Sequence, residues 1–549
     1  MATYGIDLGT TYSAIATLDD SGRPVIIENQ NDAKPILASA IYFPQDESNP
    51  PVVGEEAKNM VELEGDRVIQ FIKRDIGKEN GRTFQFGSME FNPITISSLV
   101  LKRLAEYAGE QGNDVKDVVI TCPAYFGIPE REATRQAGEV AGFNVLSIIN
   151  EPTAAALNYC AREVGENRTI MVYDLGGGTF DVSILKMTVD NGNGANIDII
   201  STDGNDRLGG KDWDDRLFQH LLNAYCNENG SEPNDAEPEL RQAIRSKVEE
   251  LKKKLTQNES KNTTISYGGS NTKIEVSREQ FNDMTKDLVA QTMGFIDSIF
   301  SKSGLNESNI DVLLLVGGST RMPMIKDAIE QRFPGKWRME DPDLAVAKGA
   351  ALYSAMIVHE QQASGAAPTG GEQPQSARPA LPPGIKSMTV QDKTPRSFGP
   401  GVMFGNNYMI DNLIFVGEVS PREIAKEYGT MFDNQPKINL RIFENVETTP
   451  EKPVTPCIDI NGDEQTTDPL LKVKNLGELN LELQPNTPKN SPIEVYFKLD
   501  VSKLYVRATD KLTGKTVDAT MDIENTMKKE ELQTAISQMA AIKTSGESD

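Results

Sequence analysis

The amino-acid sequence predicts an α/β domain with a duplicated architecture, followed by an all-β module and a short C-terminal helix. The first observation is that two distant stretches, 4–13 and 171–181, follow one plan: an apolar strand, a Gly/Thr turn preceded by Asp, and a return strand. The second is that strand and helix patterns alternate up to about residue 358. The third is a change to short strands separated by turn residues after residue 389.

Length and composition indicate a soluble protein with several folding units. A chain of 549 residues is too long for one core, and its 38% apolar and 25% charged residues are ordinary for a globular protein. No apolar run is long enough for a membrane span, and we expect no secretory signal before the first strand. The net charge of −25 argues against nucleic-acid binding, because phosphates require the opposite sign.

The cysteine and histidine content excludes two further kinds of site. The four cysteines show no paired spacing, so we expect reduced thiols in a cytoplasmic protein and no zinc site; they are Cys122, Cys160, Cys226 and Cys457. Because His220 and His359 are the only histidines, chemistry that depends on a histidine base is a poor hypothesis.

The chain divides into four predicted parts. Residues 1–358 form the α/β domain, with helices expected at 96–110, 129–141, 213–227, 239–257, 278–301 and 323–332. Residues 359–388 are rich in Pro, Gly, Ala, Gln and Ser, so we expect a flexible linker. Residues 389–525 form a β-sandwich, with strands expected at 437–444, 470–473, 479–483, 493–499, 503–510 and 515–523. Residues 526–549 form a short helix, at 528–542, and a polar tail.

Three glycine-rich turns are candidate phosphate-binding elements. Glycine lets the backbone approach a ligand closely, so that N–H groups and Thr hydroxyls point at one phosphate. Asp7 and Asp174 precede two of the turns and supply oxygens suited to a divalent cation. The third turn, 317–323, follows the apolar strand 312–316 and opens a helix. Most glycine-rich turns are only turns, but three of them in one α/β domain predict a polyphosphate site, although neither common single-loop nucleotide motif is present.

These motifs resemble those of the 70-kilodalton heat-shock protein chaperone family. The family's two phosphate signatures are similar to residues 5–13 and 174–181, and two further signatures are similar to residues 148–156 and 316–321. The resemblance covers residues 1–358 and implies an actin-like ATPase domain, a duplicated ribonuclease-H-like fold. It also implies ATP and ADP as ligands, with Mg²⁺ and with K⁺ as an additional ion.

The resemblance implies a group of catalytic residues at the phosphate end of the site. Lys73 corresponds to a lysine that neutralises charge on the transferring phosphoryl group and orients water. Its alternative is a solvated surface lysine. The other implied catalytic residues are Glu151, Asp174 and Thr179. The residues implied to hold Mg²⁺, largely through water, are Asp7, Asp174 and Asp181.

The resemblance also implies nucleotide-contacting and relay residues. The implied nucleotide contacts are Gly9, Thr10, Thr11, Tyr12, Gly176, Gly177, Gly178, Glu249, Lys252, Lys253, Thr256, Gly317, Gly318, Ser319, Arg321 and Asp343. Lys253 stands where the family has an arginine that stacks on adenine, so weaker stacking is expected. Pro123 and Arg131 match residues that relay the nucleotide state, although a purely structural proline is the alternative for Pro123.

The β module shows a weaker resemblance to the family's peptide-binding sandwich, which implies a groove for extended apolar peptides. Candidate groove residues are Phe398, Leu413, Tyr428, Met431, Ile438 and Leu440. The alternative is that they are alternating core positions of a sandwich.

Three differences from the family bear on coupling and partners. The linker lacks the family's acidic-and-leucine docking segment, and the helical lid is reduced to a stub at 528–542. Ser147 replaces an arginine to which J-domain co-chaperones bind, so that contact is not carried over. A nucleotide exchange factor is an expected partner, whereas nucleic acid and membranes are not.

We therefore predict a slowly hydrolysing ATPase that acts as a chaperone for extended apolar peptides, with altered coupling between its halves. The alternatives are a nucleotide-gated scaffold that recruits one protein partner, and a small-molecule kinase on the same fold.

Overall fold

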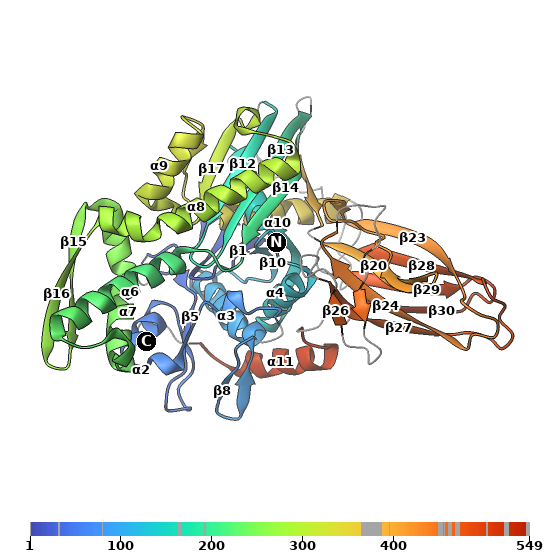
Figure 1. Ribbon diagram of the computed structural model, residues 1–549, viewed down its shortest axis with the longest axis horizontal. Helices are drawn as coiled ribbons and strands as arrows, with labels where there is room; N and C mark the ends of the chain where they lie inside the picture. The colour runs from blue at the N-terminus through green and yellow to red at the C-terminus, as the bar shows by residue number, and fades with distance from the viewer. Residues whose placement is uncertain are drawn as a thin grey trace.

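The computed structural model describes most of the chain. The described residues are 2–30, 33–78, 81–162, 166–190, 194–363, 387–394, 396–447, 454, 456–458, 464–466, 473–500, 503–520 and 526–544. Figure 1 shows a mixed α/β body and, to one side of it, an elongated region made of strands.

The α/β body contains two sheets that repeat one topology. In each sheet a β-hairpin is continued by two parallel strands on one side and an antiparallel strand on the other. The first sheet consists of β11 (Asn144–Asn150), β10 (Asp117–Cys122), β1 (Tyr4–Asp7), β2 (Tyr12–Leu18) and β3 (Pro24–Ile26), with β4 (Leu37–Ala38) paired to β2. The second consists of β18 (Trp337–Arg338), β17 (Val312–Val316), β12 (Arg168–Leu175), β13 (Phe180–Asp190), β14 (Gly194–Asn205), β19 (Ser387–Lys393) and β22 (Val419–Ser420). The predicted duplication is therefore present in the strand order.

Helices cover both sheets: one apolar cluster lies on each sheet, and a third contains residues from both sheets and from α5 and α10. The long helices are α3 (Pro93–Glu110), α4 (Ile128–Val140), α5 (Glu151–Cys160), α6 (Gly210–Asn229), α7 (Pro238–Gln257), α8 (Arg278–Ser303), α9 (Pro323–Arg332) and α10 (Ala345–Ala363). Smaller elements decorate the two halves: α1 (Glu55–Asn59), α2 (Val61–Glu64), β5 (Ala40–Tyr42), β6 (Val52–Val53), β7 (Val68–Gln70), β8 (Phe84–Phe86), β9 (Met89–Phe91), β15 (Ser260–Tyr267) and β16 (Ser270–Ser277). The predicted helices agree with these within a few residues.

Helix α10 lies between the halves and packs against α5, β1 and β2. The backbone of α10 lies so close to the backbones of α5 and β1 that only glycine fits at one position in each contact. A Cβ on Gly349 would lie 1.7 Å from the backbone oxygen of Ala154 in α5, and a Cβ on Gly5 would lie 2.0 Å from the backbone nitrogen of Ala351. These contacts fix the angle between the two sheets, because no side chain separates the backbones.

The elongated region consists of two four-stranded antiparallel sheets that share one apolar cluster. One sheet contains β21 (Asn407–Ile410), β20 (Ser397–Phe404), β24 (Lys437–Asn445) and β27 (Lys474–Glu482). The other contains β23 (Arg422–Gly429), β28 (Pro492–Leu499), β29 (Leu504–Asp510) and β30 (Thr516–Thr520). A separate short pair is formed by β25 (Pro456–Ile458) and β26 (Glu464–Thr466). The predicted strand at 470–473 lies mainly outside the described residues.

The connection between the α/β body and the β region differs from the predicted boundaries. Helix α10 continues to Ala363, so residues 359–363 are helical, and residues 364–386 lie outside the described part of the chain. The predicted boundary at 388–389 falls inside β19, which pairs in parallel with β14 as part of the second sheet. The sequence of this strand is mostly polar and gives little apolar signal, because backbone hydrogen bonds to β14 and β22 hold it in the sheet.

The prediction of a lid stub implied that the C-terminal helix α11 (Lys529–Ala541) lies against the β region. Instead, it packs against the α/β body. It lies beside α4 (Figure 1), and its buried Ala535 and Met539 join the apolar cluster of the first sheet. Lys102 Nζ on α3 donates to the carbonyls of Met539, at 3.0 Å, and Ile542. Its helical composition was recognisable in the sequence, but the surface it packs against was not. Among the described helices, none combines the length and hydropathy needed to cross a membrane.

We expect Gly349→Ala to destabilise the protein by about 1 to 3 kcal/mol, because the added methyl group forces α10 away from α5. Urea unfolding measures the loss. Gly294→Ala is the matched control, since Gly294 is an exposed position of α8 with nothing within 4 Å of an added Cβ. An equal loss in both variants would show that the α5–α10 contact is not the constraint.

Candidate functional site

A cavity of about 400 Å³ lies between the two hairpin turns, the start of α6 and the C-terminal half of α7. Most of the predicted site residues line it: Asp7, Gly9, Thr10, Thr11, Tyr12, Lys73, Glu151, Asp174, Gly176, Gly177, Thr179, Glu249, Lys252, Lys253, Thr256, Gly317, Gly318, Ser319, Arg321 and Asp343. Gly178 and Asp181 are not among the lining residues. The structure thus brings together residues that are up to about 300 positions apart in the sequence.

The two hairpin turns face each other at close range. A Cβ on Gly177 would lie 1.9 Å from Thr11 Oγ1, and a Cβ on Gly178 would lie 2.3 Å from Thr10 Cγ2. Thr11 Oγ1 is buried and has no hydrogen-bond partner among the residues that the structure describes. Backbone N–H groups and hydroxyls therefore converge on one space, and the unsatisfied hydroxyl suits an anionic ligand such as a phosphate.

A buried ion pair occupies the floor of this cavity. The side chains of Lys73 and Glu151 are only 4% and 8% exposed, and Lys73 Nζ donates to Glu151 Oε1. Lys73 lies in a 3₁₀ turn, Ile72–Arg74, and Glu151 is the first residue of α5. Burial alone would lower the pKa of Lys73, but the charges of Glu151 and Asp7 outweigh it and raise that pKa, so the lysine stays charged.

Three further carboxylates surround this pair. Asp7 ends β1, Asp174 is the second-last residue of β12, and Asp181 lies near the start of β13. Burial, together with the charge of Glu151, raises the pKa of Asp7 to about 7. Burial and the same neighbour raise the pKa values of Asp174 and Asp181 well above the usual range for Asp. Four carboxyl groups with one ammonium favour an added cation. Among the described residues, no three His, Cys, Asp or Glu side chains could hold a metal ion directly.

The other end of the cavity is closed by a network from both halves. Tyr12 donates its hydroxyl proton to Glu249 Oε1 at 3.0 Å, and Lys58 Nζ on α1 lies 2.5 Å from Glu249 Oε2. Lys253 Nζ lies 2.7 Å from Glu249 Oε1. Burial would raise the pKa of Glu249, but the two lysines outweigh it and lower the pKa to about 2. This carboxylate therefore stays ionised and holds α1 and α7 together across the cavity.

Comparison with known proteins identifies the family. A family model described as Hsp70 protein matches residues 3–85 and 79–548. The chain is 34% identical over 523 residues to the chaperone protein DnaK of Thermosipho melanesiensis, covering 93% of this chain and 78% of that protein. It is 34% identical over 522 residues to the chaperone protein DnaK of Thermosipho africanus, with the same shares covered.

The chain belongs to the Hsp70 family. It is therefore an ATP-dependent chaperone that hydrolyses ATP, and the family binds its nucleotide with Mg²⁺. The buried carboxylates and the unsatisfied hydroxyl of Thr11 fit a nucleotide polyphosphate and its cation on structural grounds.

Sequence analysis missed several residues that line the Hsp70 cavity: Ile36, Phe71, Lys211, Asp214, Gln257, Val316, Met322, Pro342 and Val346. Lys211 and Asp214 follow Gly209 and Gly210 at the start of α6. That pair of glycines was a usable signal, because glycine at a helix start also allows close backbone approach. A Cβ on Gly209 would in fact lie 2.6 Å from the backbone of Gly178.

One of the two predicted relay residues, Arg131, connects α4 to the residue that precedes Glu151. Pro123 follows directly after β10, and Arg131 is a buried residue of α4. Arg131 donates to the backbone oxygen of Phe126 at 2.9 Å and to the side chain of Asn150. Because Asn150 precedes Glu151, the position of α4 is tied to that of the buried ion pair.

The predicted peptide-groove residues of this Hsp70 protein lie in two different environments. Phe398, Leu413 and Leu440 are at most 5% exposed and fill the interior between the two sheets, so they do not line an open groove in this structure. The period-two pattern could not separate the two faces of the strands. Tyr428 and Ile438 are half-buried, and Met431 is 51% exposed. Other exposed apolar side chains of the described β region were missed: Met403, Phe404, Val419, Phe432 and Leu512.

The raised pKa of Asp7 predicts a pH-dependent stability for the nucleotide-free protein. An Asp whose pKa is raised on folding binds a proton more tightly in the folded state, so stability falls as pH rises from about 4 to 7. We expect Asp7→Asn to stabilise the protein by about 1 to 3 kcal/mol at pH 8, and by much less at pH 5, where Asp7 is protonated. Urea unfolding at both pH values measures this difference, and a gain that is the same at pH 5 and pH 8 would contradict it.

Proposed function

We propose that the cavity binds ATP and ADP with Mg²⁺ and that hydrolysis takes place at its Lys73 end. The observation that carries this proposal is the buried Lys73–Glu151 pair, set among three carboxylates where two glycine-rich turns meet. Phosphoryl transfer needs positioning and charge neutralisation more than covalent chemistry. The fixed ammonium of Lys73, beside a carboxylate cluster that favours a bound cation, supplies both the positioning and the charge neutralisation.

Each residue has a role that follows from its place. Glu151 holds the ammonium of Lys73 at the transferring phosphoryl group, where it neutralises the charge that develops. Thr10, Thr11 and Thr179 donate hydroxyl protons to phosphate oxygens, and Gly177 and Gly178 provide backbone N–H groups. Gly9 and Gly176 donate their N–H groups within the turns, to Ser13 Oγ at 3.1 Å and to the backbone oxygen of Thr179 at 3.0 Å, so they contribute by letting the backbone approach the ligand closely. Asp7, Asp174 and Asp181 hold the waters of the Mg²⁺ ion, which supplies further neutralisation of the phosphates when bound. Glu151 and Asp174 orient the attacking water.

The adenosine end of the proposed site lies against α7 and the turn that starts at Gly317. Lys252 Nζ lies 2.8 Å from Asp214, and Arg321 lies 2.6 Å from Asp343. A Cβ on Gly318 would lie 2.6 Å from Asp343 Oδ1, so this turn has room for a ribose or base only because it lacks side chains. The remaining proposed contacts are Tyr12, Glu249, Lys253, Thr256, Gly317 and Ser319. The ammonium of Lys253 is engaged by Glu249 and Tyr12, which supports weak stacking on adenine.

We propose that residues up to 363 and strand β19 form an actin-like ATPase domain, and that residues 396–520 form a β-sandwich that binds extended apolar peptides. Two exposed apolar pairs support the second part: Met403 and Phe404 end β20, and Met431 and Phe432 lie between β23 and β24. Extending the β20–β24 register places the end of β20 beside the start of β24, which brings both pairs to one end of the sheet. Unpaired apolar side chains at a sheet end suit apolar peptide segments.

Two contacts support coupling between the domains. Strand β19 pairs with β14 on one side and with β22 on the other, so backbone bonds run from the ATPase sheet into the β region. Ile128, the first residue of α4, packs in the same apolar cluster as Phe398. Since Arg131 of the same helix reaches Asn150, we propose that Pro123 and Arg131 transmit the nucleotide state to this contact.

The finer assignments of partners and location are also proposals. We propose a nucleotide exchange factor as a partner and K⁺ as a second ion, and we propose a cytoplasmic location, supported by the free cysteines Cys122, Cys160 and Cys226. Ser147 is uncharged and half-buried in β11, which supports the absence of the usual J-domain contact. The scaffold alternative is not favoured, because the relatives that match 93% of the chain are chaperones.

We expect Lys73→Ala to reduce ATP hydrolysis by a hundredfold or more, on the order of 3 kcal/mol of transition-state stabilisation, and to change ADP affinity less than tenfold. Single-turnover hydrolysis and calorimetric ADP binding measure the two effects. Lys302→Ala is the control, because Lys302 forms an ion pair with Asp203 outside the cavity. Undiminished turnover in Lys73→Ala would overturn the role of Lys73.

The proposed peptide surface predicts that replacing Met431 and Phe432 together by Ala weakens binding of a fluorescent apolar peptide about tenfold, because two exposed apolar anchors are lost. Fluorescence anisotropy gives the affinity. Leu63→Ala serves as control, since Leu63 is 78% exposed and lies in α2, away from the β region. If Leu63→Ala weakens binding as much as the double variant, the peptide does not bind at the proposed surface.

A further inference from the structure

One lysine lines the proposed nucleotide cavity without a role in the chemistry above. Lys211 is the second residue of α6, and its backbone N–H donates to the backbone oxygen of Gly177 at 2.8 Å. The N–H of Gly210 donates to the backbone oxygen of Gly176 at 2.9 Å. The first turn of α6 is therefore bonded directly to a turn that is proposed to hold phosphate.

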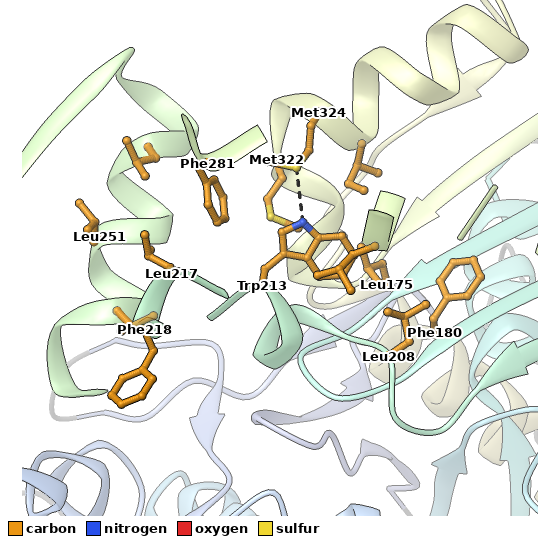
Figure 2. Packing of buried hydrophobic residues seen from close by; sticks show 14 of the residues in the cluster. Leu175, Phe180, Leu208, Trp213, Leu217, Phe218, Leu251, Phe281, Met322 and Met324 are labelled. Atoms are coloured by element: carbon orange, nitrogen blue, oxygen red, sulfur yellow. Dashed lines mark hydrogen bonds between the residues drawn. The ribbon is translucent and has the colours of Figure 1, made fainter. Parts of the chain in front are cut away.

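The first turn of α6 is also held rigidly from behind. The fully buried Trp213 packs beside Leu175 and Met322, and its indole N–H donates to Met324 Sδ at 3.4 Å (Figure 2). On the other side, Arg74 bonds both the backbone oxygen of Gly178 and the carboxylate of Asp212. The backbone of Lys211 is thus fixed relative to the phosphate turn, and only its side chain is free to move.

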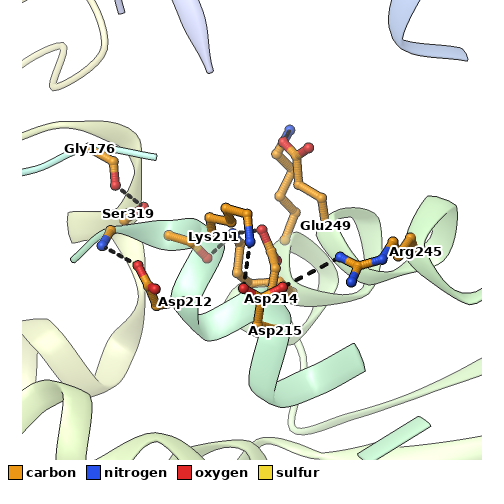
Figure 3. Close-up of polar contacts among 12 residues, drawn as sticks. Gly176, Lys211, Asp212, Asp214, Asp215, Arg245, Glu249 and Ser319 are labelled. Atoms are coloured by element: carbon orange, nitrogen blue, oxygen red, sulfur yellow. Dashed lines mark hydrogen bonds and ion pairs between the residues drawn. The ribbon is translucent and has the colours of Figure 1, made fainter. Parts of the chain in front are cut away.

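The Lys211 ammonium has two weak partners in this structure. It lies 2.5 Å from Asp215 Oδ2, one turn further along α6, and 5.8 Å from the centre of the Phe71 ring (Figure 3 shows the lysine beside Asp214 and Asp215). Both contacts are only partly buried, since the Lys211 and Asp215 side chains are 27% and 43% exposed. Such ion pairs and cation–π contacts contribute little at exposed positions. A charge-assisted bond to phosphate is stronger.

Lys211 also differs from the other cations that line the described cavity. Lys73, Lys252, Lys253 and Arg321 are each paired with a carboxylate that lines the cavity too. The partner of Lys211, Asp215, does not line it. When Lys211 turns toward a ligand, it therefore leaves no unpaired carboxylate facing that ligand, and Asp215 keeps its second partner, Arg245, at 3.5 Å.

We propose that Lys211 is a phosphate-binding residue of this site, whose ammonium leaves Asp215 and the face of Phe71 and donates to a phosphate oxygen of bound ADP or ATP. Phe71 adopts φ of 60°, and its ring lines the cavity just before the turn that carries Lys73. The ring keeps the unbound ammonium at the edge of the cavity. This inference rests on the proposed nucleotide site and adds a second cation to it, contributed by α6.

Calorimetric titrations with ADP, ATP and adenosine test the proposal on the full chain. We expect Lys211→Met to weaken ADP and ATP binding by about tenfold or more and to leave adenosine binding unchanged, since only the phosphates lose a partner. Lys211→Arg keeps most of the affinity. Lys254→Met is the matched control, because Lys254 forms the same kind of pair, 2.5 Å from Glu250, on the exposed face of α7 outside the cavity.

A second variant separates phosphate binding from a structural role. Asp215→Asn frees the ammonium, so we expect ADP affinity to rise a few-fold in the wild-type background and not at all in the Lys211→Met background. Unchanged ADP affinity in Lys211→Met, or an equal loss for adenosine, would overturn the inference. Failure of the wild-type protein to bind ADP would instead overturn the nucleotide site itself.

Discussion

The arrangement of this protein depends on one electrostatic constraint, the sharing of a single buried ammonium by four carboxyl groups. Asp7 and Glu151 come from the first sheet and the helix that follows it, whereas Asp174 and Asp181 come from the second sheet. Lys73 cannot neutralise all of them, so these carboxyl groups repel one another when they are ionised, and this is one reason that the pKa values of Asp7, Asp174 and Asp181 are raised. A cation bound between them removes this repulsion.

Close backbone packing keeps the four carboxyl groups near the single ammonium. Gly349 and Gly5 bring α10 against α5 and β1, and the glycines of the hairpin turns bring the two turns together. Because these contacts involve backbone atoms, they do not yield as a flexible side chain would. The carboxyl groups are consequently held at fixed positions. The side chains around them, such as Lys58 and Glu249 across the other end, determine how firmly the halves are closed.

Local sequence patterns were sufficient for the elements that carry their own signal. The two hairpins, the helices of the α/β body and the Lys73 and Glu151 positions could be predicted, because strand periodicity, glycine turns and family motifs lie in continuous stretches. Lys211 and Asp214 could not be recognised as lining residues, since their place depends on α6 packing against the 176–178 turn. Strand β19 was missed because its partner, β14, lies nearly 200 residues earlier. Phe398 and Leu440 were assigned to a groove because alternation does not tell which face of a strand is covered.

The position of α11 has a consequence for how the chain acquires its structure during synthesis. Met539 and Ala535 belong to the same apolar cluster as residues of the first sheet, and Lys102 bonds a carbonyl 437 residues further along. When the first half of the chain has emerged from the ribosome, part of the apolar core of the first sheet has therefore not yet been synthesised. The first lobe exposes an apolar strip on α3 and α4 until the last helix emerges, and such a strip is itself the kind of surface that chaperones bind. While the residues between α4 and α11 are being synthesised, the chain therefore exposes an apolar surface of the kind that chaperones bind.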